Sequence, residues 1–107
     1  MTSASPRSFF RIHKGTESTA TVLDPSRADG WVASDEERDT QPHGVSCCLT
    51  LDDMARYVRQ YSMYIAPGDR LLELRGYLVG QDRDRYAVRA EIVEIAGEHP
   101  LSALDGL

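Results

Sequence analysis

The stretch RLLELRGYLVGQDRDRYAVRAEIVEI, residues 70–95, decides the fold. Apolar and polar side chains alternate over residues 70–79 and again over residues 86–95. A period of two is typical of a strand that buries one face. The residues between them, GQDRDR, supply the glycine and aspartates that a hairpin loop requires. We therefore expect two paired strands, and the alternating charges of residues 82–85 indicate a solvated loop without a role in a site.

A strand that runs directly into a helix precedes this hairpin. Residues 44–48, GVSCC, are mostly apolar and fit a short buried strand. Thr50 then fits the N-cap of a helix, and Asp53 carries a charge that suits the helix N-terminus. We expect the helix to run to about Ser62. Its buried face recurs at helical spacing and consists of Leu51, Met54, Ala55 and Val58.

An earlier strand is expected over residues 9–13, FFRIH, which are rich in aromatic and β-branched side chains. Successive side chains of a strand point to opposite faces. Phe10 and Ile12 should therefore share one face, and Arg11 and His13 the other.

These elements indicate one α+β domain over residues 8–107, with a small, mostly antiparallel sheet of about four strands packed by one main helix. Residues 1–7 are interpreted as a flexible tail. Residues 16–43 are interpreted as a long irregular loop, because turn-forming pairs recur there without periodicity. Trp31 is expected to anchor that loop to the core. The chain after residue 96 holds few apolar residues and is expected to dock only loosely.

Composition and charge exclude several classes of protein. Apolar residues make up 41% and charged residues 27%, which is typical of a folded globular chain. The net charge is -5, and no stretch clusters Lys and Arg into a phosphate-binding patch, so we expect no nucleic acid partner. The sequence contains no apolar run long enough for a membrane span or a signal peptide. We therefore expect a cytoplasmic protein without membrane association.

The two adjacent cysteines, Cys47 and Cys48, fit a reducing compartment, because neighbours on a strand point apart and an ordinary disulfide between them would be strained. The cysteines and histidines lack the spacing of a zinc site, so no metal is expected. Cys48 lies near a helix start, where a thiolate is favoured, but no base is identifiable. A structural role for both thiols is the favoured interpretation.

Tyr57, Tyr61 and Tyr64 recur at spacings that would place them in a row along the expected helix. Tyrosines are favoured at interfaces, although these rings would equally cover the edge of the domain's own core. With Trp31, they are the candidate partner-binding residues. The leading hypothesis is a small interaction or regulatory module that binds a protein partner or a second copy of itself.

Two short motifs resemble those of the ADP-ribosyltransferase fold, and the resemblance that they carry covers about half of the chain. The first, FRIHKG, places Arg11 on an early strand, and the second, GVSCCLT, places Ser46 on a strand that leads into a helix. The resemblance implies NAD as cofactor, with Arg11 holding a phosphate, Ser46 bracing the nicotinamide site and His13 beside them. The chain would then be an NAD-using enzyme or an inactive relative of one.

The resemblance also implies a catalytic glutamate on a late strand, which would stabilise the positive charge that develops on the ribose. Glu91 and Glu94 are the candidates. The sequence EIVE departs from the Glu-x-Glu or Gln-x-Glu pattern of the members that modify arginine, which leaves the catalytic role open. A pocket for another small molecule, between helix and sheet with the long loop as a lid, is a third hypothesis.

Overall fold

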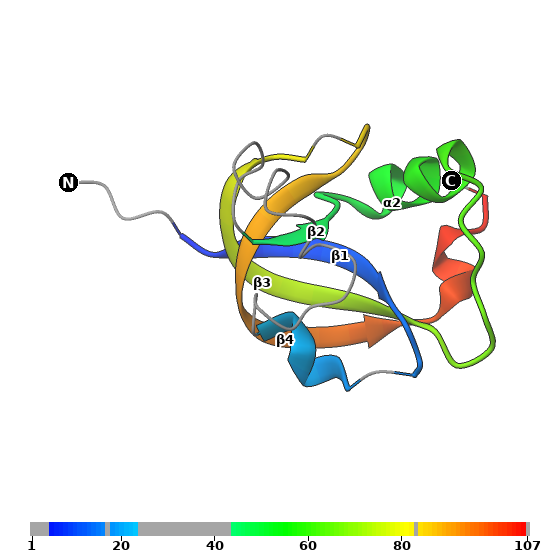
Figure 1. The fold of residues 1–107 in the computed structure, drawn as a ribbon, viewed down its shortest axis with the longest axis horizontal. Coiled ribbons are helices and arrows are strands. Elements are labelled where there is room, and N and C mark those ends of the chain that lie inside the picture. The colour runs from blue at the N-terminus through cyan, green and yellow to red at the C-terminus, as the bar shows by residue number, and fades with distance from the viewer. Residues whose placement is uncertain (1–4, 17, 24–43, 83, 107) are drawn as a thin grey trace, which may run out of the picture.

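The computed structural model describes residues 5–16, 18–23, 44–82 and 84–106 of the chain. Within these ranges the strands are β1 (Arg7–His13), β2 (Val45–Cys47), β3 (Arg70–Gln81) and β4 (Val88–His99), and the helices are η1 (Thr19–Leu23), α2 (Leu51–Gln60) and η2 (Leu101–Leu104). The strands form one antiparallel sheet in the order β1-β3-β4-β2 (Figure 1). This arrangement confirms the expected small α+β fold.

The predicted hairpin of β3 and β4 forms the centre of the sheet. Tyr77 pairs with Glu91, and Leu74 pairs with Ile95. The register shifts at three places along the ladder, and such bulges increase the local twist and bend a strand. Consistent with this, both strands curve strongly in Figure 1.

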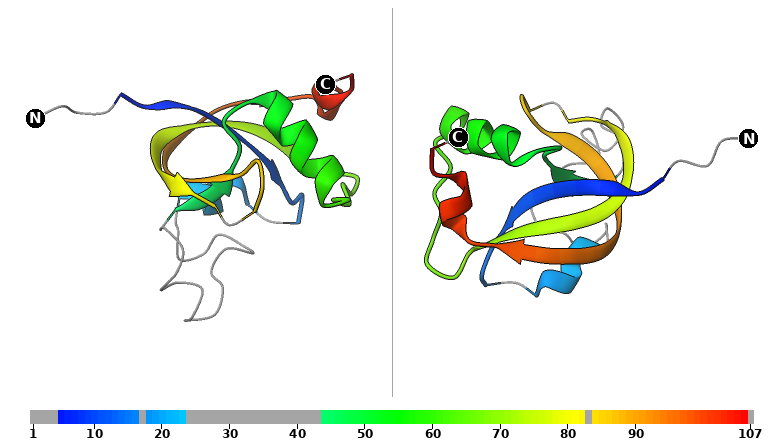
Figure 2. Two further views of the ribbon diagram at one scale, coloured as in Figure 1. Left: turned by 90° about the horizontal axis from the view of Figure 1, so that it is seen from above. Right: turned by 180° about the vertical axis from the view of Figure 1, so that it is seen from behind.

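Each face of the sheet carries its own apolar cluster, because successive side chains alternate between the faces. One cluster is centred on the side chains of Phe9, Val22, Val45, Cys47, Leu72, Leu74, Val88, Ala90 and Ile92. The second contains Ile12, Cys48, Met54 and Leu71, with Phe10 and residues of α2 and η2 packed against it. Phe10 and Ile12 therefore share a face, as predicted. The helices α2 and η2 lie together at one end of the sheet (Figure 2).

The two outer strands of the sheet meet at a single bridge. Phe10 of β1 and Cys48, just after β2, each donate a main-chain hydrogen bond of 2.8 Å to the other's carbonyl oxygen. The first and last strands in the order are thus joined at one point, which requires the sheet to curl. The bridge also brings the end of β2 to the start of α2.

The helix begins as the sequence predicts. The Thr50 hydroxyl oxygen accepts the main-chain N–H of Asp53 at 3.0 Å, and Met54 and Ala55 are buried. The helix ends at Gln60, two residues before the predicted Ser62.

Three boundaries differ from the sequence prediction. Strand β1 already begins at Arg7, which pairs with Gly76, so the predicted tail over 1–7 extends one residue too far. Within the predicted loop 16–43, η1 forms a short 3-10 helix that buries Val22 in the core, and residues 24–43 lie outside the described residues. Trp31 lies outside the described residues. The chain end does not dock loosely: β4 continues to His99, and apolar side chains of η2 pack against the second cluster.

A buried carboxylate fastens the end of β1 to the turn before β3. Asp69 accepts main-chain N–H groups from Gly15 at 3.0 Å and Ala66 at 2.9 Å, and it pairs with Lys14 Nζ at 3.2 Å. The two main-chain donors are the main reason that the pKa of Asp69 is lowered. Asp69 therefore stays ionised and closes this end of the sheet at neutral pH.

The close approach of β3 and β4 at Gly76 yields a stability prediction. A β-carbon at Gly76 would overlap the main-chain oxygen of Glu91, so Gly76→Ala should lower the free energy of unfolding by about 2–3 kcal/mol in urea denaturation. Gly97→Ala is the matched control, because no atom lies within 4 Å of a β-carbon there. We expect the control to change stability by about 0.5 kcal/mol or less. Equal effects of both substitutions would contradict the close approach.

Candidate functional site

The two residues of the ADP-ribosyltransferase resemblance meet in the structure. Arg11 reaches from β1 to β2, and its Nη1 donates a hydrogen bond of 2.9 Å to the main-chain oxygen of Ser46. Arg11 directly follows Phe10, the β1 residue of the bridge to Cys48. The contact therefore ties β1 to β2 next to the point at which the bridge joins them. Arg11 binds the backbone of Ser46, so the arrangement does not depend on the serine hydroxyl.

His13, the third predicted cofactor-binding residue, lies further along β1. Its side chain is buried, and its Nε2 lies 3.0 Å from the main-chain oxygen of Ser18. This contact holds the segment that follows β1 against the strand. The described contact of His13 is thus with Ser18, whereas that of Arg11 is with Ser46.

The two predicted catalytic glutamates are both exposed on β4 and differ in their distance along the ladder from Ser46. Ser46 pairs with Arg89, so Glu91 lies two residues along β4, on the same face as Ser46. Glu94 lies further away, beyond a register shift, where its Oε1 is 3.5 Å from Nε of Arg75. Of the two carboxylates, Glu91 is the one that the ladder places nearer to Ser46.

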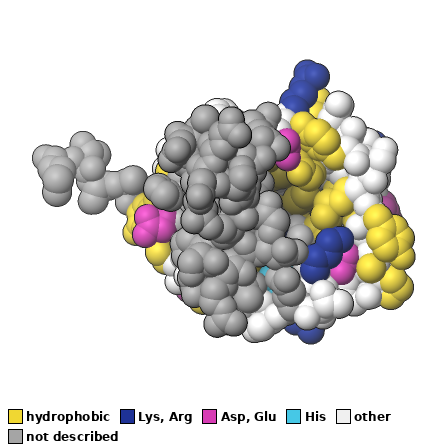
Figure 3. All heavy atoms as spheres, viewed as in Figure 1, with side chains coloured by type: hydrophobic (Ala, Val, Ile, Leu, Met, Phe, Trp, Pro, Cys, Tyr) yellow, Lys and Arg dark blue, Asp and Glu magenta, His cyan; other side chains and the backbone are white. Residues whose placement is uncertain are grey.

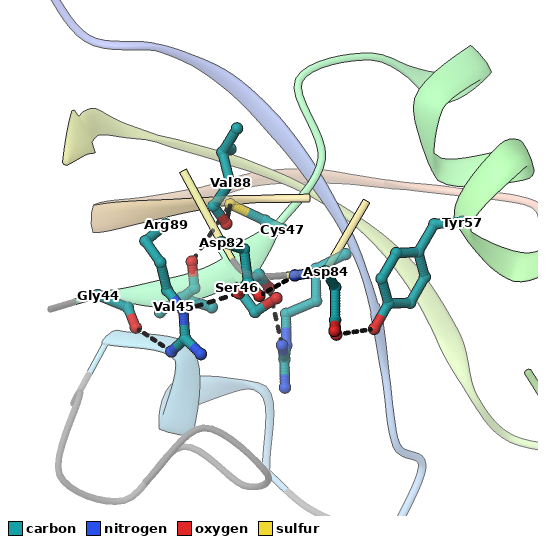
Figure 4. A network of polar contacts seen from close by, with 10 residues as sticks. Gly44, Val45, Ser46, Cys47, Tyr57, Asp82, Asp84, Val88 and Arg89 are labelled. Atoms are coloured by element: carbon teal, nitrogen blue, oxygen red, sulfur yellow. Dashed lines mark hydrogen bonds and ion pairs between the residues drawn. The ribbon is translucent and has the colours of Figure 1, made fainter. Parts of the chain in front are cut away.

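Sequence reasoning missed a buried ion pair beside this region. Arg89 Nε lies 2.7 Å from Asp82 Oδ2, and the two side chains are only 9% and 3% exposed. Arg89 Nη1 also donates to the main-chain oxygen of Gly44 at 3.2 Å (Figure 4). The prediction of a solvated loop over residues 82–85 is therefore wrong for Asp82. Asp82 and Arg89 are brought together by the pairing of two strands, and no local sequence pattern links the two charges. Sequence reasoning therefore could not identify the pair.

The predicted tyrosine row divides into a pair and a separate residue. The Tyr57 hydroxyl donates to Asp84 Oδ2 at 3.1 Å, and the Tyr61 hydroxyl accepts the main-chain N–H of Arg85 at 2.8 Å. The two rings lie 4.7 Å apart. Tyr64 comes after the end of α2 and is 74% exposed. The first two tyrosines thus hold the tip of the β3–β4 hairpin, whereas Tyr64 faces solvent.

The two cysteines are free thiols in the interior. Burial is the main cause that raises the pKa of Cys47 to about 12, despite the opposing effect of Arg11. Burial likewise raises the pKa of Cys48 to about 12. Both thiols are therefore protonated at neutral pH, and a protonated thiol is a poor nucleophile. This agrees with the structural role expected for them.

Apolar side chains also reach the surface on the central strands. Tyr77, Leu78 and Val79 of β3 are 37%, 45% and 44% exposed, and Val93 of β4 is 52% exposed. The alternation had placed Leu78 on the buried side, but the strands bend at register shifts on both sides of it. We call the exposed apolar side chains of Tyr77 and Val93 the apolar strip. Elsewhere too, apolar and charged side chains lie side by side on the surface, as on the face in Figure 3.

The described residues hold neither a metal-binding cluster nor a membrane-spanning helix. No three His, Cys, Asp or Glu side chains in these ranges gather closely enough to hold a metal ion. No helix within the same ranges is both long and apolar enough to cross a membrane.

No known protein family, curated protein or solved structure matches the chain. The resemblance to the ADP-ribosyltransferase fold, based on the motifs around Arg11 and Ser46, therefore stays a prediction.

The buried thiols give a prediction for chemical labelling. A thiol-reactive disulfide reagent should label Cys47 and Cys48 at pH 8 only at the rate at which the native protein opens, because the thiolate is scarce and the sulfur atoms are covered. In denaturant both thiols should react at once, which is the internal control. Fast labelling of either cysteine in the folded protein would contradict this account.

Proposed function

We propose that this domain is a protein-interaction module, that the apolar strip is its contact surface, and that its partner is a second copy of the chain. The observation that carries the proposal is that Tyr77 and Val93, which lie close together on neighbouring strands, both expose apolar side chains. Single exposed apolar residues are normal on a protein surface, whereas a contiguous group is typical of a contact site. Tyr77, an aromatic residue, is of the type enriched at such sites.

The ladder supports treating Tyr77 and Val93 as one surface. Tyr77 pairs with Glu91, and Val93 lies two residues further along β4. Diagonal neighbours in a sheet are within reach of an aromatic side chain. Leu78 pairs with Ala90 of the first cluster and therefore points to the other face, so it does not belong to this surface.

The charges around the strip favour a second copy as the partner. Arg75 and Glu94 form an exposed pair beside it, and Glu91 faces Tyr77 across the ladder. A two-fold interface places the same patch of both copies in contact, so that a patch of one charge sign would repel itself. With a basic and an acidic group next to the strip, the basic group of each copy can face the acidic group of the other. This is important for a chain whose net charge is -5.

Sedimentation velocity tests this proposal. The protein should form a reversible dimer at concentrations on the order of 100 µM, and Tyr77→Ser with Val93→Ser should convert it to a monomer without loss of fold. Tyr64→Ser is the control, because Tyr64 is exposed but lies outside the strip. A wild-type protein that stays monomeric, or a dimer that survives the double substitution, would refute the proposal.

One observation favours a second candidate function, NAD binding in the manner of the ADP-ribosyltransferase fold. The contact between Arg11 Nη1 and the Ser46 main-chain oxygen brings the two matching positions together. A guanidinium can hold a phosphate through two parallel hydrogen bonds, for which an ammonium is a poor substitute. Glu91 is the predicted carboxylate that the ladder places nearer to Ser46, but alternation along the strands sets both side chains on the face opposite Arg11, so the guanidinium alone supports this candidate.

An NMR titration with NAD tests this candidate. Resonances of Arg11 and Ser46 should shift and saturate at ligand concentrations on the order of a millimolar, and Arg11→Lys should weaken binding about tenfold or more. Arg75→Lys is the control, since Arg75 is an arginine on β3 that pairs with Glu94. A well-dispersed spectrum that does not change with NAD would exclude this function and leave the interaction proposal untouched.

A further inference from the structure

The tip of the β3–β4 hairpin is held from two directions. We call the tip the strap and define it as Asp82 together with residues 84–87. On one side α2 holds it, through the Tyr57 hydroxyl on Asp84 and the Tyr61 hydroxyl on the N–H of Arg85. On the other side β4 holds it, through the ion pair of Asp82 with Arg89.

The strap is also strained. Tyr86 has a φ of 72°, in the left-handed region that a bulky side chain rarely adopts. The turn around it is closed by the Ala87 N–H, which donates to the Asp84 main-chain oxygen at 3.3 Å. A strained backbone persists only where surrounding contacts impose it. The contacts of the strap with Tyr57 and Tyr61 are therefore part of what keeps it in this conformation.

Asp82 connects the strap to the start of β2. One carboxylate oxygen, Oδ1, accepts the N–H of Asp84 at 2.9 Å, and the other, Oδ2, pairs with Arg89 at 2.7 Å. The same guanidinium donates to the main-chain oxygen of Gly44, the residue before β2. A continuous path of polar contacts thus runs from Tyr57 through Asp84, Asp82 and Arg89 to Gly44 (Figure 4).

From this path we infer that the strap is a conformational device: its docking on α2 holds β2 in place, and its release loosens β2. Both ends of the path are packed elements, and the strap between them has a strained state that a small loss of contact would free. The segment that loosens carries Ser46, to which Arg11 binds. Any ligand or partner that displaces the strap from the tyrosines would therefore alter the Arg11–Ser46 contact. This inference is independent of the proposed dimer, because neither Tyr57 nor Asp84 belongs to the apolar strip.

Amide hydrogen exchange of the full chain, followed by NMR, tests the inference. Tyr57→Phe removes the hydroxyl but keeps the ring against Tyr61, and Tyr64→Phe is the matched control at an exposed site. We expect Tyr57→Phe to speed exchange about five- to tenfold at Arg85 and Ala87, and by a similar factor at Val45 and Cys47 in β2. The amides of the core strand, Leu72 and Leu74, should keep their rates. Asp84→Asn should reproduce the pattern, because it weakens the same hydrogen bond from the other side.

Each other outcome overturns the inference. Faster exchange confined to the strap would show that β2 is not coupled to it. No change at the strap would show that the Tyr57 hydroxyl does not hold it. An equal increase at Leu72 and Leu74 would show that the substitution only lowers global stability. If Tyr57→Phe acts and Asp84→Asn does not, the hydroxyl acts through a contact other than the Asp84 carboxylate, and the path described here is wrong.

Discussion

The buried ion pair between Asp82 and Arg89 is the contact on which the arrangement of this domain depends most. It lies where three parts of the chain come together: the end of β3, the start of β4 and, through the carbonyl of Gly44, the start of β2. Loss of one partner from a pair so fully removed from water strongly destabilises the folded protein, because the other charge is left buried without compensation. The short strand β2, which the order β1-β3-β4-β2 leaves at one edge of the sheet, therefore has a position set partly by charge.

The same arrangement separates the parts of the surface that chemistry could use from those that hold the fold. Cys47, Cys48 and Asp82 are buried, and their contacts are internal. The hydroxyls of Tyr57 and Tyr61 are committed to the hairpin tip. The apolar strip of β3 and β4 faces solvent, with charges of both signs beside it. This contrast is the basis on which we propose an interaction module.

The sequence predicts those features that arise within a few residues of chain. The period of two identified the hairpin over residues 70–95, and the position of Thr50 before an apolar helical pattern identified the N-cap. Contacts between distant segments had no such signal: Arg11 and Ser46 are separated by 35 residues, and Arg89 and Gly44 by 45. Their proximity depends on strand order and register. The resemblance did link Arg11 with Ser46, but it gave no indication of the Asp82–Arg89 pair.

A double-mutant cycle on that pair tests the account most directly. Asp82→Asn, Arg89→Gln and their combination should be compared by urea denaturation, with β2 followed through the amide resonances of Val45 and Cys47. We predict that each single substitution lowers the free energy of unfolding by about 3 kcal/mol and that the double variant loses less than the sum by at least about 1 kcal/mol. Strictly additive effects, with unchanged β2 resonances, would contradict the central role of this pair.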